Sequence, residues 1–319
     1  MPRIVALAGG VGGAKLAHGL YHAMPPEDLT VIVNTGDDFE HWGLRICPDL
    51  DTVCYTLAER ANPTTGWGLA GETWEVFDAV SELGGSDWFR IGDLDLVTHL
   101  VRTQQLRDGL SLSLITRDFC QAWGIRARVL PMSDQPVRTI VETDEGDLPF
   151  QEYFVYRRCE PRVRGFYFDG PLESLPAQGI REAIHRADAI VICPSNPWVS
   201  IDPILKVLAK DAQDSVFGLD PQSKPVVAVS PIVGGEAIKG PAAKMFYELG
   251  LEPSPLSVAQ QFLAYGLSGL VFDQIDQKWT DSIRSLGLKT RVAQTIMRSS
   301  ADRKSLAEVV LNFISESLE

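Results

Sequence analysis

A glycine-rich turn between an apolar strand and a helix constrains the fold of this chain more than any other feature. Residues 3–8 are almost wholly apolar, and the next five residues read Gly-Gly-Val-Gly-Gly. A helical pattern with Leu16 and Leu20 follows, and a second apolar run covers residues 30–33. Strand, glycine turn, helix and strand in this order predict a βαβ unit that opens a parallel sheet.

Later segments continue the same pattern. Residues 189–193 and 226–229 are apolar runs bounded by turn residues, as expected for strands covered on both faces. Residues 52–125 are mostly helical in pattern, and the tail over 301–318 forms an amphipathic helix. We therefore predict an α/β fold, a Rossmann-like doubly wound and mostly parallel sheet.

One stretch departs from this pattern. Segments 127–130, 137–142 and 150–156 alternate as strands, and Asp144-Glu145-Gly146-Asp147 suits a hairpin turn. We predict three parts: a Rossmann-like part with the glycine loop over 1–125, a smaller β-rich α+β insert over 126–170, and a continuation of the sheet with the C-terminal helix over 171–319. Within the first part, Leu94, Val97, Leu100 and Val101 mark the apolar face of one helix.

Charge and cysteine content exclude several classes of function. The chain has 29 Lys and Arg against 42 Asp and Glu, a formal charge of −13 at pH 7. Such a chain repels phosphate backbones and anionic lipids, so we expect no nucleic-acid or membrane partner, although one local site can still bind a small phosphorylated ligand. No apolar run approaches the ~20 residues of a membrane helix.

The five cysteines form no CxxC pair, which favours reduced thiols in the cytoplasm over disulfides or a zinc site.

The glycine loop is suited to an anion. Gly10, Gly12 and Gly13 allow close approach of a ligand and direct amide groups toward it at a helix N-terminus. The loop is not a Walker A motif, and Lys15 occupies the position of the third glycine of a dinucleotide fingerprint. The alternative is a purely structural tight turn.

Acidic residues follow the second strand and precede the next helix. Asn34-Thr35-Gly36-Asp37-Asp38 lies at the carboxyl edge of the predicted sheet, where Asp37 and Asp38 fit a ribose or a divalent metal, or form a solvated Asx turn. Asp49 and Asp51 follow Pro48, and either can act as a plain N-cap. If these acids and the Asp37–Asp38 turn face the same crevice, several carboxylates would surround one anionic ligand. Such an arrangement requires either a metal ion or an acid that acts as a general base.

Further polar residues lie near the same edge. Ser195 and Asn196 follow the strand at 189–193 and can bind a base or ribose, or serve only the turn. Lys244 begins a later helix and can hold phosphate or lie on a solvated face. Arg90 can bind an anion or a carbonyl-rich ring, and we expect His99 to be structural.

Taken together, the motifs resemble those of a known family, although no single motif is specific enough to indicate it. Over residues 3–315 the chain closely resembles the 2-phospho-L-lactate transferase family (CofD in archaea, FbiA in actinobacteria) of coenzyme F420 biosynthesis. The motifs occur in this order: the glycine loop, Asn34-Thr35-Gly36-Asp37-Asp38, Pro48-Asp49-Leu50-Asp51-Thr52-Val53, Gly92-Asp93, Leu130-Pro131-Met132-Ser133-Asp134, Pro194-Ser195-Asn196-Pro197, Ser230-Pro231-Ile232 and Gly240-Pro241-Ala242.

The resemblance implies a reaction. Family members transfer a phospholactyl or phosphoenolpyruvyl group from a guanosine-diphosphate-activated donor to the ribityl hydroxyl of FO, a deazaflavin, and release GMP. They need Mg²⁺ and have a Rossmann-like fold, and the resemblance allows a homodimer. This chain has Gly36-Asp37-Asp38 after the second strand, and the segment 42–47 follows. Both features are more similar to bacterial than to archaeal members of the family, and the resemblance therefore favours an enolpyruvyl donor.

The resemblance also implies roles for individual residues. It places Asp51 and Asp37 in catalysis, Asp51 and Arg90 on FO, and Asp37, Asp38 and Asp51 on the metal. The guanosine diphosphate and its phosphates are assigned to Gly10, Gly12, Gly13, Lys15, Asn34, Ser195, Asn196 and Lys244. One alternative is a non-catalytic nucleotide-sugar-binding regulator of the gluconeogenesis-factor type, and another is a Rossmann dehydrogenase.

Overall fold

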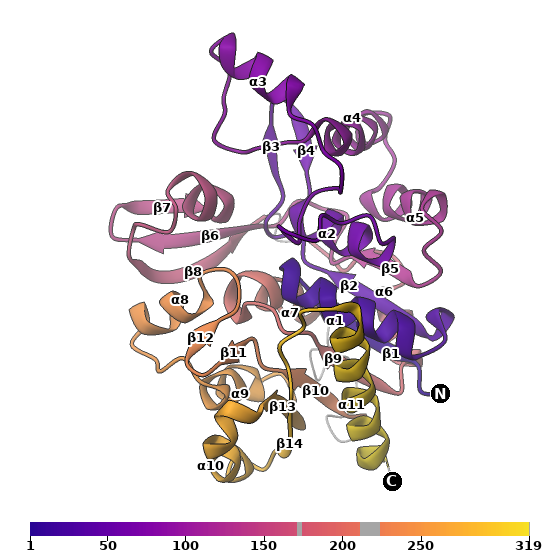
Figure 1. Ribbon diagram of the computed structural model, residues 1–319, viewed down its shortest axis with the longest axis vertical. Helices are drawn as coiled ribbons and strands as arrows, with labels where there is room; N and C mark the ends of the chain where they lie inside the picture. Colours follow the sequence, from indigo (N-terminus) through magenta and orange to yellow (C-terminus); the bar gives the residue numbers. More distant parts are fainter. Residues whose placement is uncertain (171–173, 211–223, 319) are drawn as a thin grey trace.

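The computed structural model describes residues 1–170, 174–210 and 224–318 (Figure 1). Its centre is a parallel sheet of seven strands in the order β14-β13-β10-β9-β1-β2-β5, which confirms the predicted Rossmann-like class. The strands are β1 (Ile4–Ala8), β2 (Leu29–Val33), β5 (Arg128–Pro131), β9 (Ala189–Ile192), β10 (Val226–Val229), β13 (Gly269–Asp273) and β14 (Lys289–Ala293).

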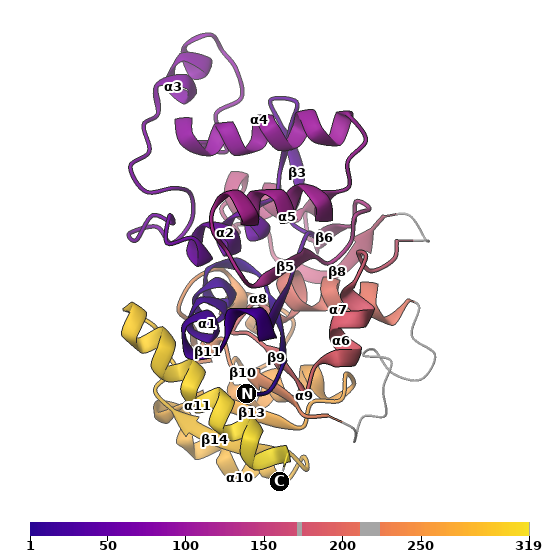
Figure 2. The same cartoon turned by 90° about the vertical axis from the view of Figure 1, so that its right-hand side faces the viewer.

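Helices cover both faces of this sheet because the strands are apolar on both sides (Figure 2). Val5 and Leu7 of β1 pack in one core cluster, whereas Ile4 and Ala6 pack in the other. The first cluster is closed by α6 (Ile180–Arg186), α7 (Asp202–Ala209), α8 (Ala242–Glu248), α9 (Pro255–Leu263) and α10 (Thr280–Arg284). The second is closed by α1 (Gly10–Ala23), α2 (Pro48–Leu57), α5 (Leu112–Ala122) and α11 (Ser300–Leu318). In the part of the chain that the structure describes, no helix combines the length and the apolar character that crossing a membrane requires.

The strand order reverses between β1 and β9. From β1 the chain continues to β2 and β5 on one side, whereas β9, β10, β13 and β14 follow on the other side. The loops that leave β1 and β9 therefore diverge at the carboxyl edge, at the position where doubly wound folds bind ligands in a crevice. We call this position, where the glycine loop meets the segment around Ser195, the crevice.

A helical extension stands beyond that edge, at the top of Figure 1. It contains the hairpin β3 (Phe39–His41) and β4 (Leu44–Ile46), with α3 (Glu75–Glu82) and α4 (Asp93–Arg107). The sequence does not predict this hairpin, because strands of three residues are too short to show a period. Trp42 and Gly43, with φ of 53° and 72°, form its left-handed turn.

α4 confirms the helix predicted with Leu94, Val97, Leu100 and Val101, but its apolar face is turned outward. Leu94, Val97, Leu100 and Val101 are exposed by 40–55 %. The opposite, polar side of α4, including Arg102, is buried instead. Ion pairs with buried acids hold this side inward, and they override the apolar periodicity.

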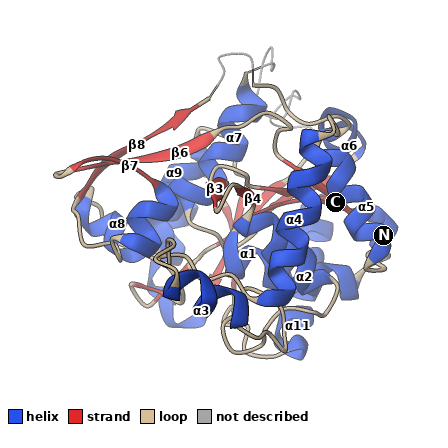
Figure 3. Ribbon diagram, turned by 90° about the horizontal axis from the view of Figure 1, so that it is seen from above, coloured by secondary structure: helices blue, strands red, loops and turns tan. Residues whose placement is uncertain are grey.

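The predicted insert is a separate antiparallel sheet of order β7-β6-β8, which extends on one side in Figure 3. Its strands are β6 (Arg138–Thr143), β7 (Gly146–Pro149) and β8 (Val163–Asp169), and the β6–β7 hairpin confirms the turn expected at residues 144–147. The strand predicted over 127–130 is confirmed as most of β5, but it lies in the main sheet and not in the insert. The strand predicted over 150–156 is wrong: the segment contains a short π-helix, η2 (Glu152–Tyr156), and Phe150 and Phe154 stack there with ring centroids 5.4 Å apart.

Candidate active site

The glycine loop packs directly against the end of β9. A Cβ on Gly12 would overlap the carbonyl oxygen of Pro194, and one on Gly13 would lie 2.6 Å from Ser195 Oγ. The Gly9 amide donates to that Oγ at 3.2 Å. The glycines therefore let the N-terminus of α1 meet the β9 loop across the crevice, and the alternative of a structural turn accounts for part of their role.

Asn34 organises the acids on the β1–β2 side. Its Nδ2 donates to Asp37 Oδ1 at 3.1 Å, to Asp49 Oδ2 at 2.9 Å and to the carbonyl oxygen of Val199, while its Oδ1 accepts from the Gly36 amide. With these bonds formed, Asn34 is better suited to positioning acids than to contacting a nucleotide.

Asp49 links the acids to the glycine loop. Its Oδ1 accepts from the Gly10 amide at 2.7 Å, so one of the amides expected to face a phosphate is held by a carboxylate. Asp49 is the second residue of α2, and the N-cap is Cys47, which makes the N-cap interpretation of Asp49 and Asp51 wrong. Both acids are nevertheless buried at the start of this helix.

Burial and mutual repulsion disfavour the charged form of these acids. Burial, and then the proximity of Asp49, raise the pKa of Asp37 well above its usual value. Burial raises the pKa of Asp49 to about 6, although the bonds from Asn34 and Gly10 oppose this shift. Two carboxylates that share one amide donor repel each other, and a divalent cation would offset that repulsion.

Asp38 is the third member of this group. Its Oδ2 accepts from Arg45 at 3.1 Å, and burial raises its pKa to about 6 against the effect of that guanidinium. Among the described residues, its other oxygen, Oδ1, is buried without a hydrogen-bond partner. Mg²⁺ prefers carboxylate oxygens, so Asp37 and Asp49, which share the Asn34 amide, are candidates for the metal that the resemblance implies. Asp38 can join them only if side chains move, because the three carboxylates are not all within 4.8 Å of one another.

Asp51 fits a different role. Arg102, which is 1 % exposed, pairs with both of its carboxylate oxygens. This ion pair already balances the charge of Asp51, which suits a contact for an acceptor hydroxyl. Asp51 also forms, with Asp95 and His99, a group whose ligand atoms lie within 4.8 Å of one another, so its predicted role at a metal stays a prediction. Arg102 also donates to the Arg45 carbonyl at 3.3 Å, which places Asp51 beside the Asp38–Arg45 pair.

His99 lies within this network, between Asp51 and Asp95. Its Nδ1 is 3.7 Å from Asp51 Oδ2, and its Nε2 is 3.5 Å from Asp95 Oδ2. Tyr55 donates to Asp95 at 2.6 Å. The network fixes the orientation of Asp51 from the side of α4. The sequence pattern does not single out Arg102 or Arg45, since an isolated arginine on a helix or hairpin usually indicates a solvated face.

Arg90 lies in the helical extension rather than among the acids. Its guanidinium carbon stacks over Trp74 at 4.1 Å and over Phe77 at 5.5 Å. Other aromatic rings gather nearby and start at Phe39, the residue after Asp38. They are Phe39, His41, Trp42, Phe77, Trp88, Phe89 and Tyr156, with ring centroids 4.8–6.3 Å apart.

Lys15 faces a cavity of about 310 Å³ between α1, α2 and the start of α11. We call it the basic cavity, because Lys15, Lys239, Arg298 and Arg303 all line it. Burial, and then Arg303 and Lys239, lower the pKa of Lys15, as expected where cations crowd together. In an acidic chain, such a cavity is suited to phosphate groups.

Two residues predicted to bind the nucleotide are engaged elsewhere. Asn196 caps the short helix η3 (Pro197–Ile201) by accepting from the amides of Trp198 and Val199. Lys244 donates to Glu248 at 2.6 Å, to the Pro161 carbonyl and to Tyr153 Oη. An ammonium group has three donors, so these partners satisfy Lys244, and a phosphate would have to displace one of them.

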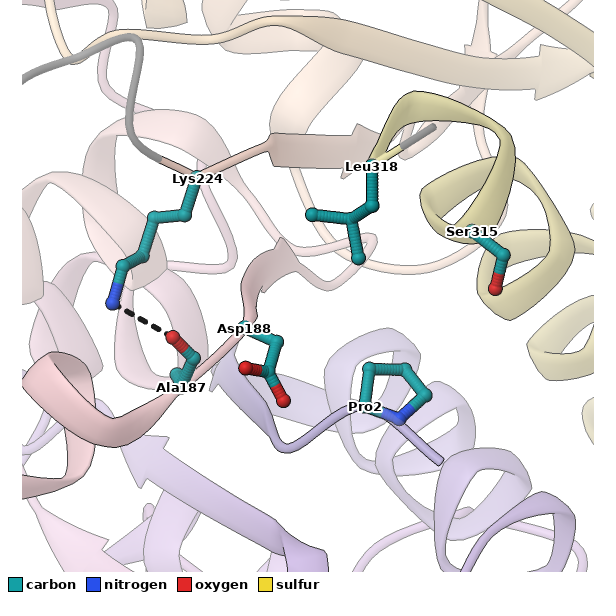
Figure 4. A pocket seen from close by; sticks show the side chains of 6 residues that line it. All are labelled: Pro2, Ala187, Asp188, Lys224, Ser315 and Leu318. Carbon is teal, nitrogen blue, oxygen red and sulfur yellow. Dashed lines mark hydrogen bonds between the residues drawn. The ribbon is translucent and has the colours of Figure 1, made fainter.

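A second cavity, of about 460 Å³, lies at the opposite edge of the sheet (Figure 4). Lys224 there donates to the carbonyls of Ile184, His185 and Ala187 and thereby caps α6. Asp188 accepts from the Arg3 amide at 2.7 Å. Both charged groups serve the structure, so this cavity does not compete with the crevice as a functional site.

Comparison with known proteins adds independent findings. The family model described as "2-phospho-L-lactate transferase CofD" matches residues 4–307. A phosphoenolpyruvate transferase of Streptomyces griseus is 40% identical over 98% of this chain and 99% of its own length. A 2-phospho-L-lactate transferase of Methanosarcina mazei is 37% identical over 97% of this chain and 99% of its own length.

The fold also matches a solved structure. A UPF0052 family protein of Bacillus halodurans superimposes with a TM-score of 0.61, covering 98% of this chain and 100% of that one. At 15% identity, this likeness supports the fold alone.

Proposed function

Because the chain belongs to the 2-phospho-L-lactate transferase (CofD) family, we propose that it transfers a phosphoenolpyruvyl or 2-phospholactyl group from a guanosine-diphosphate-activated donor to FO. The ribityl hydroxyl of FO attacks the phosphorus that carries the acid, a new P–O bond forms, and the bond to GMP breaks. The family and the named relatives favour this reaction over the alternative of a regulatory nucleotide-sugar-binding protein.

One observation carries the proposal for this chain: buried acids meet the N-terminus of α1 at the point where the strand order reverses. Asp37 and Asp49 share the Asn34 amide, and Asp49 also holds the Gly10 amide. Repelling carboxylates at a helix N-terminus suit a site that binds a cation and an anionic diphosphate together. Asp37 and Asp49, with Asp38 where its side chain moves to join them, would hold Mg²⁺, which when bound neutralises charge on the diphosphate.

Asp51 is proposed to bind the attacking hydroxyl and to accept its proton as the P–O bond forms. Arg102 keeps the carboxylate fixed, so the acceptor meets a preorganised partner. Asp51 thus orients the hydroxyl in the bound complex and accepts its proton only as the transition state forms.

The deazaflavin ring is proposed to lie against the aromatic rings near Arg90. Planar π-systems stack on such rings, and the cluster begins one residue after Asp38. The Arg90 guanidinium, already stacked on Trp74, is placed to meet a ring carbonyl.

The donor's diphosphate is proposed to lie at the N-terminus of α1, with its nucleotide in or beside the basic cavity. Val11, one residue before Gly12, lines that cavity together with Lys15. Ser195 Oγ, which accepts from Gly9, can still donate its proton to a phosphate or ribose oxygen.

The test is a transfer assay with mass detection of the product. The protein is given FO, Mg²⁺ and an equimolar mixture of the enolpyruvyl and lactyl donors. We expect a phosphodiester of FO and one GMP per product, with the enolpyruvyl product in excess. Asp51→Asn should lower turnover by more than its loss of stability explains; because it leaves Arg102 buried without its anion, turnover is compared at a temperature at which unfolding measurements show the variant folded. Asp118→Asn, at an exposed pair on α5, should change neither turnover nor stability. Absence of product from both donors at every Mg²⁺ concentration would overturn the proposal.

A further inference from the structure

Three potential metal ligands gather away from the acids described above. His18 and His22 lie one turn apart on α1, and Glu59 follows the end of α2. Glu59 Oε1 is 3.3 Å from His22 Nε2 and 3.7 Å from His18 Nε2. One ligand atom from each residue lies within 4.8 Å of the other two.

His18 is the unusual member of this cluster. Its side chain is 3 % exposed, and its Nδ1 has no hydrogen-bond partner among the described residues. With Nδ1 carrying the ring proton, Nε2, which faces Glu59 Oε1, is available as a metal ligand.

The spacing suits a tetrahedral ion. Zinc bonds of about 2.0–2.1 Å to nitrogen and oxygen place neighbouring tetrahedral ligands about 3.3 Å apart. The His22–Glu59 separation matches this value, and the His18–Glu59 separation needs only a small side-chain adjustment. Because His22 and Glu59 are partly exposed, their side chains are free to make that adjustment.

We propose that His18, His22 and Glu59 form a site for a divalent transition metal of the zinc type. Two imidazoles and one carboxylate favour such ions over Mg²⁺. Three protein ligands leave one position open, and His18 and Glu59 line the basic cavity, so that position faces the cavity.

The charges around the site determine the chemical nature of the fourth metal ligand. Lys15, Lys239, Arg298 and Arg303 line the same cavity and disfavour a bare cation. They also attract anions, so the fourth ligand is an anion rather than a neutral group. The site therefore binds its metal more tightly when a small anion such as phosphate is present.

Metal binding would join two helices of the crevice. α1 carries the glycine loop at its start, and α2 carries Asp49 at its start. Glu59, two residues past the end of α2, adopts a left-handed φ of 56° that turns the chain back toward α1. A metal that links Glu59 to both histidines stabilises the folded chain, because it binds that state alone.

The experiment uses Co²⁺ as a spectroscopic probe for zinc, on the full chain without an affinity tag and without FO or donor. We expect one Co²⁺ per chain with visible absorption typical of tetrahedral coordination, displaced by Zn²⁺. Because His18 is buried, the variants are His22→Ala and Glu59→Gln at the exposed positions, each weakening binding by at least about tenfold. The matched control is His185→Ala, which removes an exposed histidine of α6 and should leave binding unchanged.

Two results would overturn this site. One is equal Co²⁺ affinity in wild type, His22→Ala and Glu59→Gln. The other is a near-ultraviolet thiolate band, which would assign the metal to cysteine. Neither result depends on turnover, so failure here is distinguishable from failure of the transfer reaction.

Discussion

Replacing Asp37 with asparagine should stabilise the metal-free protein and abolish its activity. Asp37 Oδ1 and Asp49 Oδ2 lie 3.1 and 2.9 Å from the same Asn34 nitrogen, so the two oxygens are at most about 6 Å apart. Two unit charges at about 6 Å repel by about 3 kcal/mol at an effective dielectric constant of about 20. Asp37→Asn removes this repulsion and keeps an oxygen that accepts from Asn34.

The effect depends on pH with a defined sign. The pKa of Asp37 lies well above 3.8 in the folded chain and that of Asp49 rises to about 6, so the folded state binds more protons than the unfolded state in this range. Stability contributed by this pair therefore falls as pH rises from about 4 through 6. The gain from Asp37→Asn should be small at pH 4 and grow to about 3 kcal/mol near pH 7.5.

The assay is urea unfolding at both pH values, with a chelator and then with Mg²⁺. Wild type should gain stability from Mg²⁺ at pH 7.5, and the variant should gain less. Asp38→Asn is the matched comparison: it removes the partner of Arg45, so it should not stabilise the metal-free chain. If Asp37→Asn destabilises the chain at pH 7.5 without metal, the repulsion argument is refuted.

Further predictions concern the groups around the acids. Arg102→Met leaves the Asp51 carboxylate buried without a cation and should cost about 3–5 kcal/mol in urea unfolding, and a loss below about 1 kcal/mol would contradict the ion-pair argument. Gly12→Ala forces a methyl group into the end of β9 and should cost about 1–3 kcal/mol with reduced turnover, so an unchanged midpoint would show that the contact is loose. Lys15→Met should raise KM for the guanosine-diphosphate donor, whereas Lys244→Met should not, and the reverse order would support Lys244 as a phosphate contact.

Local sequence signals predict the frame of the site. Apolar runs such as 189–193, followed by turn residues, identify central strands without knowledge of the rest of the chain. The glycines of the first loop and the acids after β2 then fall at one edge, since the carboxyl ends of parallel strands meet there. For this reason the sequence alone is enough to bring Gly12, Asp37 and Ser195 together.

Residues that act through ion pairs across the fold could not be predicted in this way. Arg102 is 51 positions from Asp51 in sequence, and nothing local distinguishes it from a solvated arginine. The exposed apolar face of α4, where Val97 is 55 % exposed, shows the same limit: periodicity predicts a helix but not which side turns inward when charges compete. Lys244 resembles a phosphate ligand in sequence because its partner Glu248 matters only once the helix has formed.

The central claim is that Asp37, Asp38 and Asp49 form a single cation site beside the glycine loop. The most direct measurement is anomalous scattering from a crystal grown with Mn²⁺ and guanosine diphosphate. The account predicts a Mn²⁺ peak among these three carboxylates and in contact with the diphosphate, with Asp51 still paired to Arg102. A peak on Asp51, or a diphosphate bound without metal at the opposite edge of the sheet, would contradict it.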